Sequence, residues 1–118
     1  MNIPQKYCNP VDLMLAAPVG ECIAIHKAKP EDKIGYCEFS THPAGWRAAH
    51  RQIEADQKRG KTVRQFLSVF APKTENDTEK YIKFFCDEMR CKDSDLLSSF
   101  SKYAIAGVMA EMEGYYAQ

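Results

Sequence analysis

The sequence lacks a surplus of charge of either sign. Its 118 residues include 16 lysines and arginines and 16 aspartates and glutamates, so the formal net charge is zero. Proteins that bind nucleic acids or anionic membrane surfaces usually carry a basic surplus. The balance of charge therefore predicts no nucleic-acid partner.

Long hydrophobic runs are missing as well. The apolar stretches are far shorter than the roughly 20 residues that cross a bilayer, and residues 1–6 are not followed by a long apolar segment. We therefore expect no membrane partner and no signal peptide. The chain should be made and folded in a cytoplasm.

The cysteines lack the pattern of a secreted disulfide scaffold. There are five, an odd number, and no C-x-x-C pair occurs. The residues that could contribute to a zinc site are Cys22, His26 and Cys37, with His42 or His50 as a fourth ligand. Cys37 with either of the last two histidines is also a conceivable nucleophilic pair. Neither spacing is typical, so we expect no metal and no cofactor, and we interpret the cysteines as buried free thiols.

Apolar residues are plentiful in total. They make up 45% of the chain and include six phenylalanines, six tyrosines and one tryptophan, which is typical of a domain with its own core. The length fits one domain. We expect a single domain over residues 1–118, with irregular structure and a β-hairpin in residues 1–40 and helices in residues 41–118.

The first third of the chain predicts little regular structure besides the hairpin. Residues 21–26 and 33–39 alternate between apolar and polar side chains, and a polar, proline-containing turn separates them. Upstream, the apolar run 11–17 stands between Pro10 and Pro18. That run predicts one or two helical turns that end at the second proline.

A long helix is predicted to begin just after residue 40. Thr41 or His42 is suited to cap it, and a proline stands in its first turn. Trp46 and Ile53 follow helical spacing, so both should face the core. Gly60 is suited to end the helix because glycine tolerates the left-handed conformation.

Three more helical segments follow. A short helix over residues 62–70 should end at Ala71-Pro72. The capping boxes that fit the next helix are Thr74 with Asp77 and Asn76 with Glu79. Its apolar residues are Tyr81, Ile82, Phe85 and Met89, and those of the last helix are Phe100, Ala104, Val108 and Met112. The last helix should run from about Ser99 to a stop at Gly114. The expected fold class is therefore α+β, mostly helical, with a small β-hairpin followed by four or five packed helices.

Four short motifs follow one another along the chain. They are Asn9-Pro10, then Gly45-Trp46-Arg47-Ala48, then Gly60-Lys61-Thr62-Val63, and last Phe70-Ala71-Pro72 with Glu75-Asn76-Asp77-Thr78 and Tyr81-Ile82. In their order and spacing they resemble the motifs of short tailed-phage virion structural proteins with a lysozyme-like character. Family members begin with Asn-Asn-Pro-Gly-Asn-Ile, and Val11 stands here in place of that glycine.

The resemblance implies a lysozyme-like fold and a structural protein in the phage virion. Its partners would be other virion proteins, with peptidoglycan as a further partner, and it could form an oligomer. Any catalysis would be weak or absent. One alternative is an active peptidoglycan-degrading glycosidase that works while the genome is delivered into the cell. A second is a small phage regulatory or inhibitor protein that binds a host protein.

Candidate site residues follow from the glycosidase alternative. Lysozyme-like enzymes place a general-acid glutamate at a helix end, in a partly apolar setting beside a hairpin. In the resembling family the last helix often ends in a glutamate close to a glycine. Glu113 stands at that point here, and Glu38 in the second predicted strand is the candidate partner carboxylate. Glu21 and Asp12 are the other acidic residues of the first third.

Arginines provide a second set of candidates. Arg47 and Arg51 lie one helical turn apart in the first long helix, and Arg64 lies in the next helix. Guanidinium groups bind carboxylates well. These three residues are therefore the candidates to bind a partner protein, unless they form an ordinary solvated surface.

Overall fold

The protein is α+β and mostly helical, as the sequence predicts. The computed structural model describes residues 2–70 and 75–117. In these ranges the elements are α1 (Ile3–Lys6), β1 (Met14–Leu15), β2 (Cys22–His26), β3 (Gly35–Phe39), α2 (His42–Lys58), α3 (Val63–Phe70), α4 (Glu75–Met89), the 3-10 helix η1 (Leu97–Ser99) and α5 (Lys102–Met112). None of the helices in the described part of the chain is long and apolar enough to cross a membrane.

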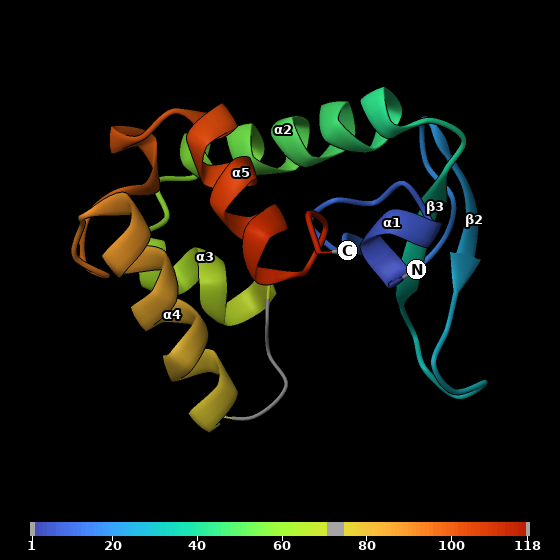
Figure 1. Cartoon of the computed structure of the whole chain (residues 1–118), viewed down its shortest axis with the longest axis horizontal. Coiled ribbons are helices and arrows are strands. Elements are labelled where there is room, and N and C mark those ends of the chain that lie inside the picture. Colours follow the sequence, from blue (N-terminus) through green and yellow to red (C-terminus); the bar gives the residue numbers. More distant parts are fainter. Residues whose placement is uncertain (1, 71–74, 118) are drawn as a thin grey trace.

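The sheet and helices α3 and α4 lie toward opposite ends of the long helix α2. Figure 1 shows α2 running along one edge of the molecule, with β2 and β3 near its start and α3 and α4 toward its other end. Helix α2 packs on β3, η1 and α5, and α4 packs on both α3 and α5. The two chain ends meet, because the Asn2 amide nitrogen donates to the Gly114 carbonyl oxygen at 2.6 Å.

The predicted hairpin is present, but it belongs to a three-stranded antiparallel sheet of order β1-β3-β2. In the pairing of β2 with β3, Ile25 faces Cys37 and His26 faces Tyr36. In the other pairing, Met14 of β1 faces Tyr36. β3 is therefore the central strand, and its residues alternate between buried and half-buried positions.

The helical turns predicted for residues 11–17 are wrong, because this run contributes strand β1 instead. Asn9 explains the difference. Its side-chain oxygen accepts from the Leu13 backbone N–H at 2.8 Å, and its amide nitrogen donates to the carbonyls of Leu13 at 2.9 Å and Cys37 at 2.8 Å. These bonds hold the chain beside β3, so a tertiary contact overrides the local helical pattern.

Helix α2 begins and ends close to the predicted positions. The Thr41 hydroxyl accepts from the Ala44 N–H at 3.2 Å, which satisfies one of the free N–H groups of the first turn. Gly60 follows the helix with a φ of 72°. Ile53 is fully buried, as expected. Trp46 is only half-buried, so its assignment to the core is wrong in part: it packs against the edge of the core.

Helices α3 and α4 match the predicted segments, with α4 beginning at Glu75. The expected helix stop at Ala71-Pro72 and the cap at Thr74 lie outside the described residues, as does the side chain of Asn76. Ile82 and Phe85 of α4 are buried, as their spacing predicts. Tyr81 is half-buried beside them.

The last helix differs from its prediction in start and in orientation. Residues 97–99 form η1, and Ser101 caps α5, its hydroxyl accepting from the Tyr103 N–H at 3.2 Å. The buried residues are Ile105, Ala106, Met109 and Ala110. Of the residues that the spacing predicted to face the core, Ala104 is exposed. The others are half-buried: Phe100, Val108 and Met112. Because α5 carries small or apolar residues on almost every side, its sequence alone does not select the buried face.

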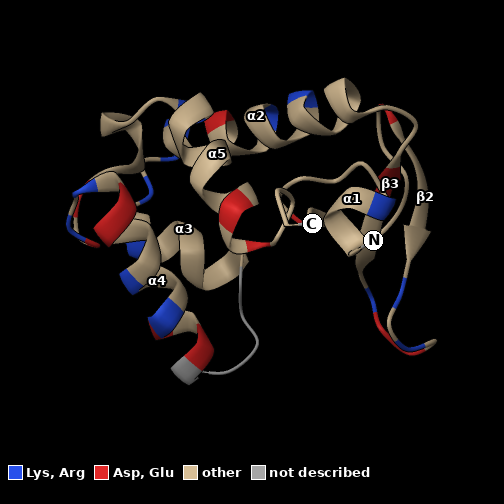
Figure 2. Cartoon of the chain, viewed as in Figure 1, with Lys and Arg blue, Asp and Glu red and all other residues tan. Residues whose placement is uncertain are grey.

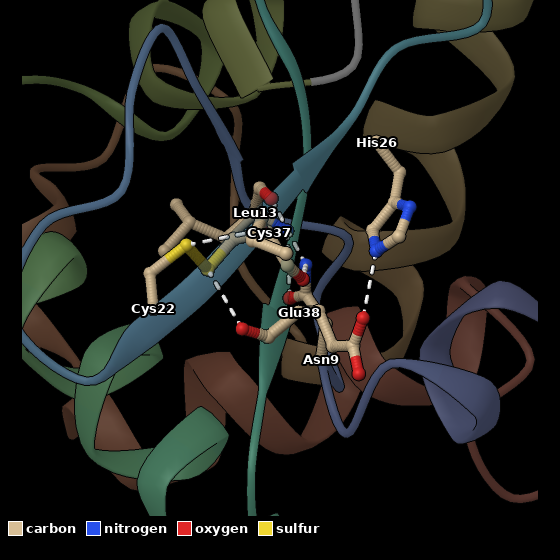
Figure 3. The surroundings of a disulfide bond; sticks show 7 residues. Asn9, Leu13, Cys22, His26, Cys37 and Glu38 are labelled. Atoms are coloured by element: carbon tan, nitrogen blue, oxygen red, sulfur yellow. Dashed lines mark hydrogen bonds and ion pairs between the residues drawn. A yellow bond between two sulfur atoms is a disulfide. The ribbon is translucent and has the colours of Figure 1, made fainter.

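Two of the five cysteines are joined, which corrects the expectation of free thiols. Cys22 and Cys37 form a disulfide between β2 and β3, with their Cα atoms 5.8 Å apart (Figure 3). Antiparallel pairing brings these residues together, with a β-bulge between Cys22 and Ala24 shifting the register. A disulfide cysteine offers no thiol to a metal or a substrate. The zinc and nucleophile hypotheses that use these two residues are therefore wrong.

Removing this disulfide should destabilise the protein. We expect the Cys22→Ala/Cys37→Ala variant to lose about 3 kcal/mol of unfolding free energy, the value for a loop of about 15 residues, which matches the sequence separation of 15. Urea unfolding with and without a reducing agent measures the effect. The reducing agent should lower the wild-type midpoint and leave that of the variant in place. A wild-type midpoint that reduction does not change would contradict the prediction.

Candidate functional site

A cleft of about 660 Å³ lies between the sheet side of the molecule and the last helices. Asp12 and Met14 line it from the N-terminal segment, together with the start of β3 and the loop before it. Phe70, the last residue of α3, lines the cleft on the side of the helices. The full lining is Asp12, Met14, Asp32, Lys33, Ile34, Tyr36, Phe70, Asp77, Tyr81, Met112 and Glu113. Five separate parts of the chain thus converge on one concave surface.

Glu113 enters the cleft because α5 ends there. Its backbone N–H donates to the Met109 carbonyl at 2.9 Å, and Gly114 then leaves the helix with a φ of 84°. The Tyr81 hydroxyl of α4 donates to the Glu113 carboxylate at 2.9 Å. Burial raises the pKa of Tyr81 well above its usual value, and the negative charge of Glu113 raises it further. Tyr81 therefore remains a protonated donor at any physiological pH.

The cleft combines a negative charge with apolar walls. Four carboxylates line it against the single amine of Lys33. Acidic residues are visible at the C-terminal end of α5 and at the tip of the β2–β3 hairpin, on either side of this region (Figure 2). Methionine, isoleucine, phenylalanine and tyrosine side chains supply the apolar part of the lining. Such a surface suits an uncharged or cationic ligand with many hydrogen-bond donors, since carboxylates only accept hydrogen bonds.

Glu38, the expected partner of Glu113, does not line this cleft. Its carboxylate hydrogen-bonds His26 Nε2 at 2.7 Å on the sheet (Figure 3), and the His26 ring stacks on Tyr7 with centroids 4.1 Å apart. The carboxylates that share the cleft with Glu113 are those of Asp12, Asp32 and Asp77. Sequence reasoning missed the last two. Asp77 could have been found, because it stands in the Glu-Asn-Asp-Thr motif.

The three candidate arginines already bind carboxylates of their own chain. Arg47 makes two hydrogen bonds to Glu21, at 3.0 and 2.5 Å, and Arg51 approaches the same carboxylate at 3.9 Å. The hydrogen bond from Arg47 holds the pKa of Glu21 below its usual value. These contacts tie α2 to the residue just before β2.

Arg64 lies apart from the other two arginines and joins α3 to α4. It donates to the Glu79 carboxylate at 2.5 and 3.1 Å and also pairs with Asp93. The hydrogen bond from Arg64 lowers the pKa of Glu79. The structure therefore gives all three arginines an internal role, and it does not bring them together as one surface.

Each histidine ring lies against the ring of an aromatic side chain. His50 stacks on Trp46 and meets Tyr103 edge-on, with centroids 5.9 and 4.7 Å apart. Tyr115 packs on Trp46 and shares a 2.8 Å hydrogen bond with His42 Nδ1. Among the described residues, no group of three or more histidine, cysteine or acidic side chains is placed to hold a metal ion.

The chain matches no model of a protein family, and no curated protein sequence matches it significantly.

Proposed function

We propose that the protein is a phage virion component whose Glu113 cleft binds the glycan strands of peptidoglycan, with little or no cleavage. The observation that carries the proposal is the pairing of Tyr81 with Glu113 inside an acidic, half-apolar cleft. The volume of about 660 Å³ falls in the range of roughly 300–1,000 Å³ that is typical of ligand sites. A lysozyme-like fold belongs to the same proposal.

The chemistry of the lining favours a sugar polymer. Sugar hydroxyl and acetamido N–H groups donate hydrogen bonds, and the carboxylates of Asp12, Asp77 and Glu113 accept them. The carbon faces of a sugar ring are apolar and match the side chains of Tyr36 and Phe70. The negative charge would repel nucleic acid and other polyanions. A neutral glycan with polar edges and apolar faces therefore fits the cleft best.

Binding is favoured over hydrolysis by what surrounds Glu113. A general acid must donate a proton to the leaving oxygen, whereas the Glu113 carboxylate accepts one hydrogen bond from Tyr81. Glycosidases also need a second carboxylate, about 5–5.5 Å away for retaining chemistry or about 6.5–9.5 Å away for inverting chemistry. Glu38, the carboxylate expected for that role, is hydrogen-bonded to His26 outside the cleft, so a partner for Glu113 would have to come from Asp12, Asp32 or Asp77.

The virion setting rests on the four sequence motifs. Two of them contribute to the cleft, because Phe70, Asp77 and Tyr81 of the last motif line it, and Asn9 of the first motif positions the segment that carries Asp12. Mass spectrometry of purified particles tests this part of the proposal. We expect peptides of the chain in particles that have been washed free of lysate, and their consistent absence would refute the virion assignment.

A sedimentation assay with insoluble peptidoglycan tests the cleft. Wild-type protein should sediment with the peptidoglycan without clearing the suspension. Glu113→Gln should bind at least about tenfold more weakly, because it loses a charged acceptor that is worth about 1.5–3 kcal/mol. Glutamine can still accept from Tyr81, so the fold should persist.

Glu88→Gln is the matched control, since Glu88 is exposed on α4 and does not line the cleft. It should bind like the wild type. Wild-type protein that stays in the supernatant would refute the glycan-binding proposal. Clearing by the wild type and not by Glu113→Gln would instead establish the active glycosidase, with Glu113 as its acid.

A further inference from the structure

Two of the free cysteines lie side by side where α4 ends. The Cys91 N–H donates to the Cys86 carbonyl at 3.1 Å, five residues back along the chain. This bond requires the intervening Arg90 to adopt a left-handed φ of 54°, as in the turn that closes many helices. The two side-chain thiols are close enough that each shifts the pKa of the other. The third free cysteine, Cys8, lies in the N-terminal segment.

Both thiols are reachable but unreactive on their own. Cys86 and Cys91 are each half-buried. Burial raises the pKa of Cys91 to about 12, and the neighbouring Cys86 and Asp95 raise it further. Burial raises the pKa of Cys86 too. Because the thiolate is the reactive form, these raised pKa values slow attack on a disulfide near neutral pH, and alkaline pH should speed it.

We propose that Cys86 and Cys91 are a dithiol that closes to a second, reversible disulfide when the protein meets an exchangeable disulfide in an oxidising compartment. Their contact at the end of α4 carries this inference, and it does not depend on what the cleft binds. The oxidant is a small-molecule disulfide or the disulfide of a thiol oxidase. The presence of the Cys22–Cys37 disulfide in the same chain suits such a compartment.

The exchange proceeds in two balanced steps. One protein thiol loses its proton, and its sulfur attacks the donor disulfide; a mixed disulfide forms and one donor thiol leaves. The second protein thiol then loses its proton and attacks the protein sulfur of the mixed disulfide. The Cys86–Cys91 bond forms, and the second donor thiol leaves. The protein is oxidised by two electrons, and the donor disulfide is reduced to two thiols.

The new bond would fix the contact between the start of α3 and the loop that follows α4. The loop after Cys91 holds the start of α3, because Asp95 and Asp93 accept from the N–H groups of Val63 and Arg64, each at 2.9 Å. Cross-linking Cys86 to Cys91 would hold this loop to α4, the helix that also carries Tyr81. The modification would therefore make the helical wall of the cleft more rigid.

Disulfide mapping on the full chain tests the proposal. The protein is incubated with oxidised glutathione at mildly alkaline pH, and then separately with diamide, a faster oxidant. Free thiols counted under denaturing conditions should fall from the three of Cys8, Cys86 and Cys91 to one. The mass should fall by two hydrogen atoms. Trypsin cuts after Arg90 and Lys92, so the disulfide should link peptide 84–90 to peptide 91–92.

Single variants separate this outcome from general oxidation. Cys86→Ser and Cys91→Ser should each keep glutathione as a mixed disulfide on the remaining partner, whereas Cys8→Ser should still form the linked peptides. Three thiols that survive both reagents would overturn the proposal. So would stable glutathione adducts on the wild-type pair, or a cross-link that involves Cys8.

Discussion

Asn9→Asp is expected to destabilise the protein by about 4 kcal/mol, the combined cost of unpaired buried polar groups and a buried charge. Asn9 is fully buried, and its side chain makes three hydrogen bonds to the backbone of Leu13 and Cys37. Aspartate would keep the acceptor for the Leu13 N–H. It would also place an oxygen against the two carbonyls that now accept from the Asn9 amide, so attraction would become repulsion.

Urea unfolding measures this effect, with Asn2→Asp as the matched control. Asn2 is half-exposed and caps α1 through its side-chain oxygen, which aspartate retains. The control should therefore cost only about 1 kcal/mol, for the lost bond to the Gly114 carbonyl. Equal unfolding midpoints for the two variants would show that Asn9 does not hold the N-terminal segment to β3.

Gly45→Ala is expected to destabilise the protein by about 3 kcal/mol or more, although alanine is the better helix former. A Cβ atom at Gly45 would lie 1.8 Å from the Cys8 carbonyl oxygen and 3.0 Å from Pro10 Cδ. The nearest atom is backbone, so no rotamer change relieves the overlap. Helix α2 and the N-terminal segment would have to move apart.

Gly107→Ala, the same substitution in α5, is expected to raise the stability of the protein. Gly107 stands in the interior of α5, and beyond the backbone of its own helix and its chain neighbours no atom lies within 4 Å of the added Cβ. Here the helix preference of alanine should dominate and stabilise the protein by about 0.5–1 kcal/mol. Thermal unfolding of both variants decides the matter. A Gly45→Ala protein that melts above the wild type would refute the close approach of α2 to Cys8.

Asn9 and Gly45 show what two of the motif residues do in the fold. Asn9 fastens the N-terminal segment to the central strand, and Gly45 lets the first turn of α2 approach that segment closely. Both belong to the motifs on which the proposed likeness to phage virion proteins rests. Their role here is structural, so the resemblance bears on the fold more directly than on a reaction. The last motif differs, because its Asp77 and Tyr81 line the cleft.

The position of the cleft was only partly accessible from sequence. The stop at Gly114 indicated that Glu113 ends a helix, and that is where the structure places it. Its hydrogen-bond donor, Tyr81, lies 32 residues earlier, and the sequence places it only on the apolar face of the predicted helix. An apolar spacing pattern identifies a tyrosine as inward-facing, but it does not say what its hydroxyl meets, because that partner comes from another helix.

Local signals were enough to define most of the elements. The alternation in residues 21–26 and 33–39 determined the hairpin, and Thr41 and Gly60 determined where α2 begins and ends, because capping and strand patterning depend on neighbours within a few residues. Helix α1 was not predicted. Its four residues are too few for a periodic pattern, and it is held by bonds from its cap Asn2 to Gly114 and from Gln5 to Tyr115.

Contacts between distant residues decided the rest. Asn9 turned an apparently helical run into strand β1, packing against α2 and α4 selected the buried face of α5, and strand pairing joined Cys22 to Cys37. In each case the sequence allowed more than one outcome of similar local free energy. The choice between them depended on hydrogen bonds and burial that exist only once the chain has folded. Composition and periodicity therefore established the α+β class, whereas the tertiary structure established the cleft.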